Sequence, residues 1–165
     1  MTPEQKYLRA FQTMHRVCKE MGWGDPFSYA RSREIHMAIV LGHKISDTYS
    51  GADAIEPDGS MTEYKTTIQS KIEATYNGIS LQPTWEEQVR YLKKEKIECY
   101  KNHYFARYSN GKIVELWRMS GKDILDILLP KIKKQYFSQL NRKDPRLGAK
   151  LTQKEIIEHS TCLYV

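Results

Sequence analysis

The sequence predicts an α+β, or mixed α/β, fold. Two observations predict this class. Segments with helical apolar spacing and helix caps are interspersed with short β-prone segments, and tight-turn signals join several of the latter into antiparallel pairs. A length of 165 residues fits one domain, residues 1–165. The 40% share of hydrophobic residues is enough for a core and excludes a disordered tail.

Composition narrows the classes of function. The 26 Lys and Arg residues exceed the 20 Asp and Glu residues, and the net charge of +6 suits a polyanionic partner, although ordinary basic domains carry such a charge too. No apolar run approaches the roughly 20 residues of a membrane span, and the N-terminus lacks the apolar stretch of a signal peptide. Cys18, Cys99 and Cys162 are far apart, which indicates reduced thiols in a cytoplasmic protein rather than disulfides or a zinc site.

The first expected element is a helix over residues 3–21, within a helical arm of residues 1–24. Thr2 suits the cap and Pro3 the first helical position, and two glycines follow the helix. Apolar side chains recur along one face at helical spacing: Tyr7, Leu8, Phe11, Met14, Cys18 and Met21. This stripe packs either on the core of its own chain or on a second subunit across a two-fold axis, and the spacing leaves both interpretations open.

Capping and turn signals predict the elements that follow. In order, we expect a helix over 30–42, a hairpin over 50–69, a helix over 85–96, strands over 103–109 and 112–119, a helix from 120 that is kinked or broken near Pro130, a basic loop over 141–150, a helix from 152 and a strand over 161–165. Thr84 and Thr152 each begin a capping-box sequence, and Asn110-Gly111 is the strongest short hairpin signal. The apolar side of the helix over 30–42 is expected to consist of Ile35, Ala38, Ile39 and Leu41.

The hairpin over 50–69 has three charged residues at a suggestive spacing. Glu63 and Lys65 are two apart on a strand and therefore share a face. Residues 57–59, Pro-Asp-Gly, are typical of a three-residue loop with glycine in the left-handed conformation. Counting outward from that loop sets Asp53 directly opposite Glu63, with Cβ atoms about 4.5–5.5 Å apart. A two-residue loop would instead move Glu63 to the other face.

This arrangement suits metal-assisted chemistry on phosphates. Two carboxylates so close repel each other unless a cation lies between them, and paired carboxylate oxygens suit Mg²⁺. With Lys65 beside Asp53 and Glu63, the group fits phosphodiester hydrolysis, and the basic composition provides a surface for DNA. The alternative is a solvated strand edge with an aspartate nearby by chance. The apolar Ala54-Ile55 beside Asp53 favours the chemical interpretation, because charges on a partly buried strand are costly.

Seven short segments of the chain show a family resemblance in their order and separation. They are Ser50-Gly51-Ala52-Asp53-Ala54-Ile55, Glu63-Tyr64-Lys65, Asn77-Gly78-Ile79-Ser80, Phe105-Ala106-Arg107-Tyr108, Lys122-Asp123-Ile124-Leu125, Glu158-His159-Ser160-Thr161 and Leu163-Tyr164-Val165. On these segments the chain resembles the PD-(D/E)xK nuclease superfamily, and within it the PvuII-like type II restriction endonucleases. The resemblance covers, discontinuously, residues from about 30 to the end and implies a restriction-endonuclease-like core, in which a mixed central sheet is flanked by helices.

The resemblance also implies roles for the charged residues. Asp53 and Glu63 would bind Mg²⁺, Lys65 would orient or activate the attacking water, and the products would have a 5′-phosphate and a 3′-hydroxyl. The chain departs from the family pattern because its first carboxylate follows Ala52 rather than a proline. A literal Pro57-Asp58 lies at the hairpin tip, where we interpret it as turn chemistry. If Asp58 were the ligand, Asp58→Ala would abolish cleavage and Asp53→Ala would spare it.

Other site residues follow from the resemblance. Some superfamily members have a supporting acidic residue on the first core helix, and Glu34 is the candidate here; the alternative is a solvated helix charge favoured by the dipole. Residues 75–84 match a strand and turn that enter the major groove in the PvuII-like enzymes. The DNA-binding candidates in this segment are Asn77, Ser80, Gln82 and Thr84. The alternative is an ordinary polar loop, and the histidines of the family are absent here, so the recognised sequence is expected to differ.

The sequence therefore predicts a homodimeric type II restriction endonuclease that cuts double-stranded DNA with Mg²⁺. A dimer is expected because one chain has one candidate site, whereas cutting both strands of a palindrome needs two sites. A DNA methyltransferase is the expected functional partner, since the host DNA must be protected. Two alternatives stay open: a structure-specific repair or recombination nuclease of the same superfamily, and a non-enzymatic DNA-binding protein that uses the same basic surface.

Overall fold

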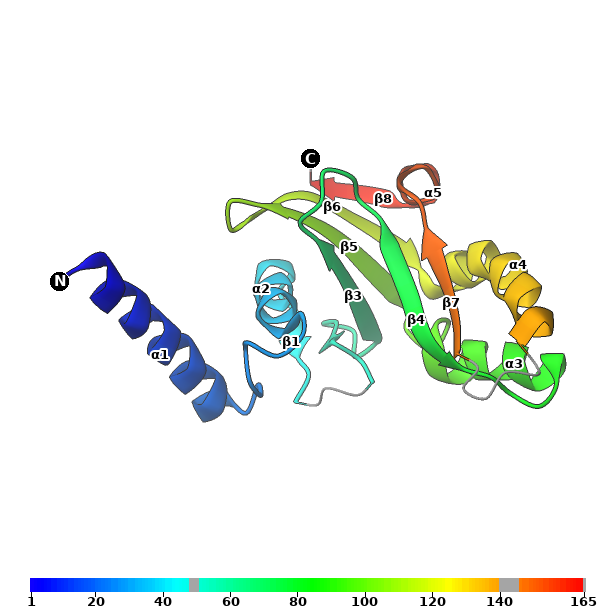
Figure 1. Ribbon diagram of the computed structural model, residues 1–165, viewed down its shortest axis with the longest axis horizontal. Coiled ribbons are helices and arrows are strands. Elements are labelled where there is room, and N and C mark those ends of the chain that lie inside the picture. The colour runs from blue at the N-terminus through cyan, green and yellow to red at the C-terminus, as the bar shows by residue number, and fades with distance from the viewer. Residues whose placement is uncertain (48–50, 140–145, 165) are drawn as a thin grey trace. The chain divides into compact units, whose positions relative to one another are not determined.

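The computed structural model describes residues 1–47, 51–139 and 146–164, and its fold class is α+β, as predicted (Figure 1). The chain divides into two units, Met1–Ser60 and Met61–Val165, which are described in turn. The first unit contains α1 (Pro3–Met21), α2 (Arg31–Leu41), β1 (Lys44–Ile45) and β2 (Ala54–Ile55). In it, β1 and β2 pair antiparallel, with Ile45 opposite Ala54.

Helix α1 has the predicted bounds, and local bonds explain both ends. The amide of Gln5 donates to the Thr2 hydroxyl, the Gln5 side chain accepts from the Thr2 amide at 2.9 Å, and Gly22 ends the helix with a φ of 69°. Of the predicted apolar stripe, Cys18 is buried and the other five side chains are exposed. Phe11 stacks on Phe27, with ring centroids 3.9 Å apart. The stripe therefore presents an apolar face rather than packing into the core.

Helix α2 ends at Gly42, as predicted, but the prediction of its buried side was partly wrong. Ile35 and Ala38 are buried, whereas Ile39 is 61% exposed and Met37, which the helical stripe does not include, is fully buried. The error arises because α2 is covered on more than one side, so a single 3.6-residue stripe does not describe its burial.

The turn after β2 is the predicted three-residue loop. The Glu56 amide donates to the Ser60 carbonyl at 2.9 Å, and the Gly59 amide donates to the Glu56 carbonyl at 2.9 Å. Gly59 has a φ of 86°, which suits glycine at the left-handed position. The Asp58 carboxylate accepts from the Ser60 amide and hydroxyl at 3.0 and 2.6 Å. Asp58 thus acts in the turn, as the sequence indicates.

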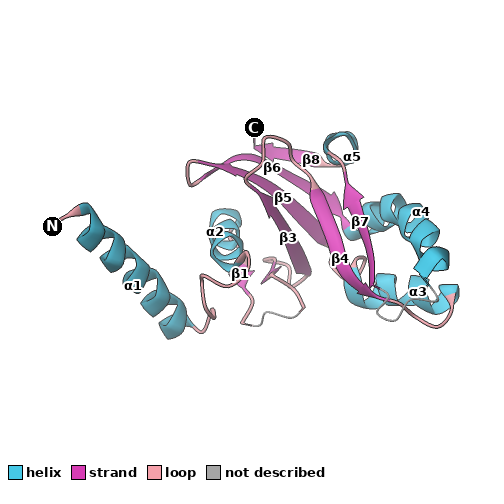
Figure 2. Ribbon diagram, viewed as in Figure 1, coloured by secondary structure: helices cyan, strands magenta, loops and turns pink. Residues whose placement is uncertain are grey.

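The second unit contains a mixed sheet in the order β3-β5-β6-β8 (Figure 2). The strands are β3 (Met61–Thr67), β5 (Asn102–Ser109), β6 (Lys112–Ser120) and β8 (Thr161–Tyr164). Strands β3 and β5 are parallel, and the other neighbours are antiparallel. The predicted Asn110-Gly111 turn joins β5 to β6, with φ values of 49° and 74° and Ser109 paired with Lys112.

A two-stranded sheet of β4 (Ala74–Ser80) and β7 (Arg146–Leu151), here called the ribbon, completes the strands of this unit. The expected basic loop over 141–150 was wrong for residues 146–150, which lie in β7, while 140–145 are outside the described residues. The sequence of β7 alternates polar and apolar residues, and its apolar Leu147, Ala149 and Leu151 are buried. That alternation outweighs the loop character suggested by the basic residues.

The predicted caps at Thr84 and Thr152 begin two of the helical elements that the structure describes in the second unit. The described helical elements are α3 (Trp85–Tyr91), the π-helical turn η1 (Leu92–Lys96), α4 (Gly121–Gln139) and α5 (Gln153–His159). Thr84 and Thr152 form capping boxes with Glu87 and Glu155. We expected a kink or a break near Pro130, and the break was wrong because α4 continues through that residue. Buried Leu128 and Ile132 on either side of Pro130 pack in the core, and this packing offsets the lost backbone hydrogen bond.

One hydrophobic core lies among the ribbon, the sheet and α4. Its members include Tyr76 and Ile79 from β4 and Phe105 from β5. They also include Leu125, Leu128 and Ile132 from α4, and Leu147 and Leu151 from β7. Gly121 lets α4 begin close to the loop between η1 and β5, because a Cβ there would clash with the Tyr100 carbonyl oxygen and lie 2.9 Å from that of Ile97. None of the helices in the described part of the chain is long and apolar enough for a membrane span.

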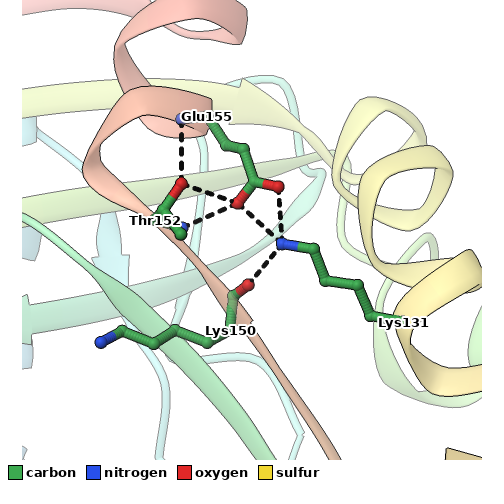
Figure 3. A network of polar contacts seen from close by, with 4 residues as sticks. All are labelled: Lys131, Lys150, Thr152 and Glu155. Atoms are coloured by element: carbon green, nitrogen blue, oxygen red, sulfur yellow. Dashed lines mark hydrogen bonds and ion pairs between the residues drawn. The ribbon is translucent and has the colours of Figure 1, made fainter.

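A polar network joins α4 to the connection between β7 and α5 (Figure 3). The Lys131 ammonium donates to the backbone carbonyl of Lys150 at 2.7 Å and contacts both carboxylate oxygens of Glu155, at 2.6 and 2.7 Å. One of those oxygens also accepts from the Thr152 amide and hydroxyl. Lys131 belongs to a basic stretch of the sequence, yet its charge stabilises the contact of α4 with the segment between β7 and α5.

Candidate active site

Glu63 and Lys65 form an ion pair on one face of β3. Their side chains are partly buried, with exposed fractions of 17% for Glu63 and 26% for Lys65. In the parallel pairing of β3 and β5, Glu63 lies opposite His103 and Lys65 opposite Phe105, and both partners are buried. The predicted shared face is thus observed, and the pair lies beside a buried surface rather than at a fully solvated edge.

Lys65 also lies over the ring of Tyr76, with its Nζ 5.1 Å from the ring centroid. The hydroxyl of Tyr76 and Nδ1 of His103 are 2.9 Å apart, and Nε2 of His103 is 2.9 Å from the carbonyl oxygen of Ile97. A carbonyl can only accept, so Nε2 has the proton and Nδ1 accepts from the Tyr76 hydroxyl. The contacts therefore continue from Lys65 through Tyr76 and His103 to the backbone at Ile97.

Burial sets the protonation of the groups around this pair. It lowers the pKa of His103 to about 3, against the raising effect of the bond to Ile97, and the charge of Lys65 acts in the same direction as burial. Burial also raises the pKa of Tyr76 well above its usual value, and the charge of Glu63 adds to this. Burial likewise raises the pKa of the Cys99 thiol. All three are neutral near pH 7.

Asp53 lies in the first unit, directly before β2. Its side chain is partly buried, and its carbonyl accepts from the Ser46 amide at 3.2 Å. The turn that the register argument requires is present, with Glu56 and Ser60 as the closing pair. The opposition of Asp53 and Glu63 across that hairpin remains a prediction from the turn chemistry.

Glu34 lies on α2 in the first unit, where it pairs with an arginine. Its carboxylate is 3.5 Å from Arg31, which is 2% exposed. The Arg31 guanidinium also donates to the carbonyls of Trp23, at 2.7 Å, and Ser46. Glu34 therefore helps to balance a buried positive charge, which accounts for an acidic residue here without a metal. Its role in supporting a metal remains a prediction.

The donor set suits Mg²⁺ in kind, though it is small. Glu63 contacts Lys65 through Oε1, and carboxylate oxygens are the ligands that Mg²⁺ prefers. Mg²⁺ keeps several waters and often needs only one or two protein carboxylates, of which Glu63 provides one; a Mg²⁺ shared with Asp53 of the first unit remains a prediction. His103 uses both ring nitrogens in hydrogen bonds and does not join this set. Among the described residues, no group of three or more His, Cys, Asp or Glu side chains is placed to hold a metal ion.

The candidate DNA-binding residues lie on or directly after β4. Asn77 and Ser80 are exposed, whereas Tyr76 and Ile79 on the same strand are buried, so the strand has an outer and an inner face. The register shifts between Tyr76 and Ile79, and Gly78 has a φ of 68°, which marks a β-bulge. The bulge places both Asn77 and Ser80 on the exposed side.

Two of the four candidates have local structural roles. The Thr84 hydroxyl accepts from the Glu87 amide at 3.2 Å and caps α3. The Gln82 side chain donates to the Ser80 carbonyl at 3.3 Å, and the Gln82 backbone carbonyl accepts from the Tyr136 hydroxyl. Asn77 and Ser80 are thus the better-placed of the four for a partner, although a base contact by each of the four remains a prediction.

The ribbon also has basic residues on its exposed face, among them Arg146, which belongs to a basic cluster that the sequence suggests could contact phosphates. Arg146 lies opposite Ser80 and Lys150 opposite Thr75, and all four residues are exposed. The Lys150 ammonium pairs with Glu73. The alternation of Arg146, Gly148 and Lys150 with buried apolar residues was the available signal, because it predicts a strand with a basic outer face.

No family model matches the chain, and no curated protein matches it either. The resemblance to restriction endonucleases therefore remains a prediction from the sequence.

Proposed function

We propose that this chain is a type II restriction endonuclease, a Mg²⁺-dependent enzyme that hydrolyses phosphodiester bonds in double-stranded DNA at specific sequences. The observation that supports it best is the Glu63–Lys65 pair, a partly buried carboxylate and ammonium on one face of β3. The confirmed turn at 56–60 supports the register that sets Asp53 opposite Glu63. Together these residues form the acidic pair and lysine of the family pattern.

In this proposal Asp53, Glu63 and Lys65 divide the chemistry between them. Asp53 and Glu63 hold Mg²⁺, which supplies polarisation of the scissile phosphate when bound. Lys65 orients the attacking water and offsets the negative charge that develops on the phosphate oxygens. The water oxygen bonds to phosphorus and gives up one proton to solvent, the bond from phosphorus to the 3′ oxygen breaks, and that oxygen takes up a proton from solvent. The products are a 5′-phosphate and a 3′-hydroxyl.

DNA recognition is assigned to the outer face of the ribbon. A two-stranded antiparallel ribbon fits the major groove, and Asn77 can pair with adenine through two hydrogen bonds. Arg146, on the same face, suits either a guanine or a phosphate. Binding is expected to weaken steeply with salt, because the protein is basic overall.

The proposed enzyme acts as a homodimer, and the exposed stripe of α1 is its proposed interface. Leu8 is 58% exposed although the stripe is apolar, and a second copy would cover it. Leu8→Glu is expected to shift the protein from dimer to monomer in sedimentation velocity. The matched control is Ile39→Glu, at an exposed apolar position of α2 in the same unit. A wild-type monomer, or an unchanged dimer in Leu8→Glu, would contradict this interface.

The proposal also includes a setting in the cell. A restriction enzyme needs a DNA methyltransferase that protects the host DNA, and a methyltransferase gene beside the gene for this chain would support the proposal. The three free cysteines suit the reducing cytoplasm, which is where such a pair would act.

Plasmid digestion tests the function. Intact protein with Mg²⁺ is expected to give discrete fragments, and Asp53→Asn is expected to give none while still binding DNA. Asp58→Asn serves as the matched control, because that carboxylate acts in the turn. Preferential cutting of branched over plain duplexes would instead indicate a repair or recombination nuclease. Salt-sensitive DNA binding without cleavage of any DNA would refute the enzyme and indicate a DNA-binding protein.

A further inference from the structure

The second unit contains a buried support behind Lys65 that the proposed chemistry does not yet use. Tyr76 is 6% exposed and lies on the inner face of β4, with its ring 5.1 Å from the Lys65 Nζ. A cation at this distance from the face of an aromatic ring is attracted by the ring quadrupole. The attraction is stronger in a partly desolvated site than in water.

The ring of Tyr76 is itself held from behind. Its hydroxyl donates to Nδ1 of His103, which is fully buried, and Nε2 of His103 donates to the Ile97 carbonyl. These two bonds use both ring nitrogens and leave His103 in one tautomer. The position of the Tyr76 ring is therefore fixed by β5 and by the loop after η1, and not by β4 alone.

A lysine on a strand needs such a support if it is to act on a water. Its four-carbon stem is flexible, and the Glu63 carboxylate is the other charged group in contact with it. In the proposed function Glu63 also binds a metal ion, so its attraction for Lys65 is shared. The ring contact does not depend on the metal and keeps the ammonium in place in either state.

We propose that Tyr76 is a positioning residue for Lys65 and that His103 holds the Tyr76 ring in place. This inference rests on the proposed function, since it gives Lys65 a task that requires positioning. Tyr76 also precedes Asn77, whose side chain lies on the exposed side of the same strand. One strand thus joins a proposed reader of bases to the support of the proposed catalytic lysine.

The first measurement tests the contact without any cleavage. In protein with isotope-labelled lysines, the ε-methylene protons of Lys65 are expected upfield of the other lysines because they lie near the ring face, and Lys65→Met assigns the signal. Tyr76→Leu is expected to return this signal to the usual lysine position, whereas Tyr76→Phe, which keeps the ring, retains the upfield shift. An unshifted Lys65 signal in the intact protein would overturn the inference, whether or not the protein cleaves DNA.

The second measurement tests the consequence for catalysis. On a duplex that the intact protein cleaves, Tyr76→Leu is expected to lower the single-turnover rate about tenfold, while the Kd for that duplex changes less than about twofold. Tyr76→Phe is expected to restore the rate to within about threefold of the intact protein. Thermal unfolding shows whether each variant is folded at the assay temperature.

Tyr104→Leu is the matched control, because Tyr104 is a buried tyrosine of β5 that pairs with Tyr64, one position away from Lys65 along β3 and on the opposite face. It is expected to leave the rate unchanged. A Tyr76→Leu rate equal to that of the intact protein, or an equal loss in Tyr104→Leu, would refute the positioning role. Absence of cleavage by the intact protein would refute the proposed function instead, and the lysine signal would still report on the contact.

Discussion

Two lysine–glutamate pairs in the second unit resemble each other in exposure and differ in what surrounds them. The pair of Lys131 and Glu155 joins α4 to the cap of α5, and both carboxylate oxygens have donors. The pair of Glu63 and Lys65 lies within one strand, two residues apart, and the contact of Lys65 with β4 is to the aromatic ring of Tyr76 rather than an ion pair or a hydrogen bond. The first pair is explained by the fold it holds together.

The second pair has no comparable structural benefit. A partly exposed ion pair contributes about 0–1 kcal/mol, and burial of its charges is unfavourable. Stability therefore accounts less well for this carboxylate and ammonium than for the pair of Lys131 and Glu155. In this comparison, the hydrogen bonds from several elements identify Lys131 and Glu155 as a structural pair. Glu63 and Lys65 are the candidate for chemistry.

The largest expected effect separates the two pairs by activity. Lys65→Met is expected to lower DNA cleavage by about 10²–10⁴-fold, the range of a residue that assists proton transfer or stabilises developing charge. Lys131→Met is the matched substitution at the other pair and is expected to leave the single-turnover rate of the folded protein unchanged. Both are measured on one plasmid substrate with Mg²⁺. An equal loss of cleavage rate in Lys65→Met and Lys131→Met would contradict a catalytic role that is specific to Lys65.

A second prediction concerns the buried support beneath Lys65. The pKa of His103 in the folded state is about 3, below its ordinary value of 6.5, so between these values the unfolded chain binds a proton that the folded chain does not. The contribution of neutral, buried His103 to the free energy of unfolding is therefore fully present above pH 6.5. It falls as the pH is lowered toward 3. The slope is about 1.4 kcal/mol per pH unit, or about 2 kcal/mol between pH 6.5 and 5.

Urea unfolding over this pH range measures that slope. His103→Gln, which can still donate and accept but does not titrate in this range, is expected to lack this part of the pH dependence. A slope that is the same in the variant and in the intact protein would mean that His103 titrates normally and that the support is open to water.

The sequence predicted the parts of this molecule that depend on local chemistry. Caps at Thr2, Thr84 and Thr152 and the turn at Asn110-Gly111 are confirmed, because each involves hydrogen bonds or backbone angles within a few residues. Glu63 and Lys65 were found for the same reason, since residues two apart on a strand share a face.

What the sequence missed depends on tertiary contacts. The continuity of α4 through Pro130 follows from burial of Leu128 and Ile132, and the burial of Met37 follows from contacts on more than one side of α2. Tyr76 and His103 are 27 residues apart, and no local pattern pairs them. In β7, the basic residues favour a loop, whereas the alternation of polar and apolar residues favours a strand. The structure has the strand.

The smallest expected effect tests the structural pair by stability. Lys131→Met removes charged hydrogen bonds to Glu155 and to the Lys150 carbonyl, which is expected to lower the free energy of unfolding by about 1–2 kcal/mol after discounting partial exposure. Burial alone would raise the pKa of Glu155, but the bonds from Lys131 and Thr152 together lower it below 4.5. The stability from this pair is therefore present above pH 4.5 and is lost as the pH falls through the lowered pKa.

Urea unfolding is expected to show a smaller acid-dependent loss of stability in Lys131→Met than in the intact protein. Lys65→Met, which leaves this network intact, is expected to retain the full loss. An unchanged acid dependence in Lys131→Met would mean that the capping bonds from Thr152 alone lower the pKa of Glu155, and that the lysine contributes little even in the pair that joins two elements.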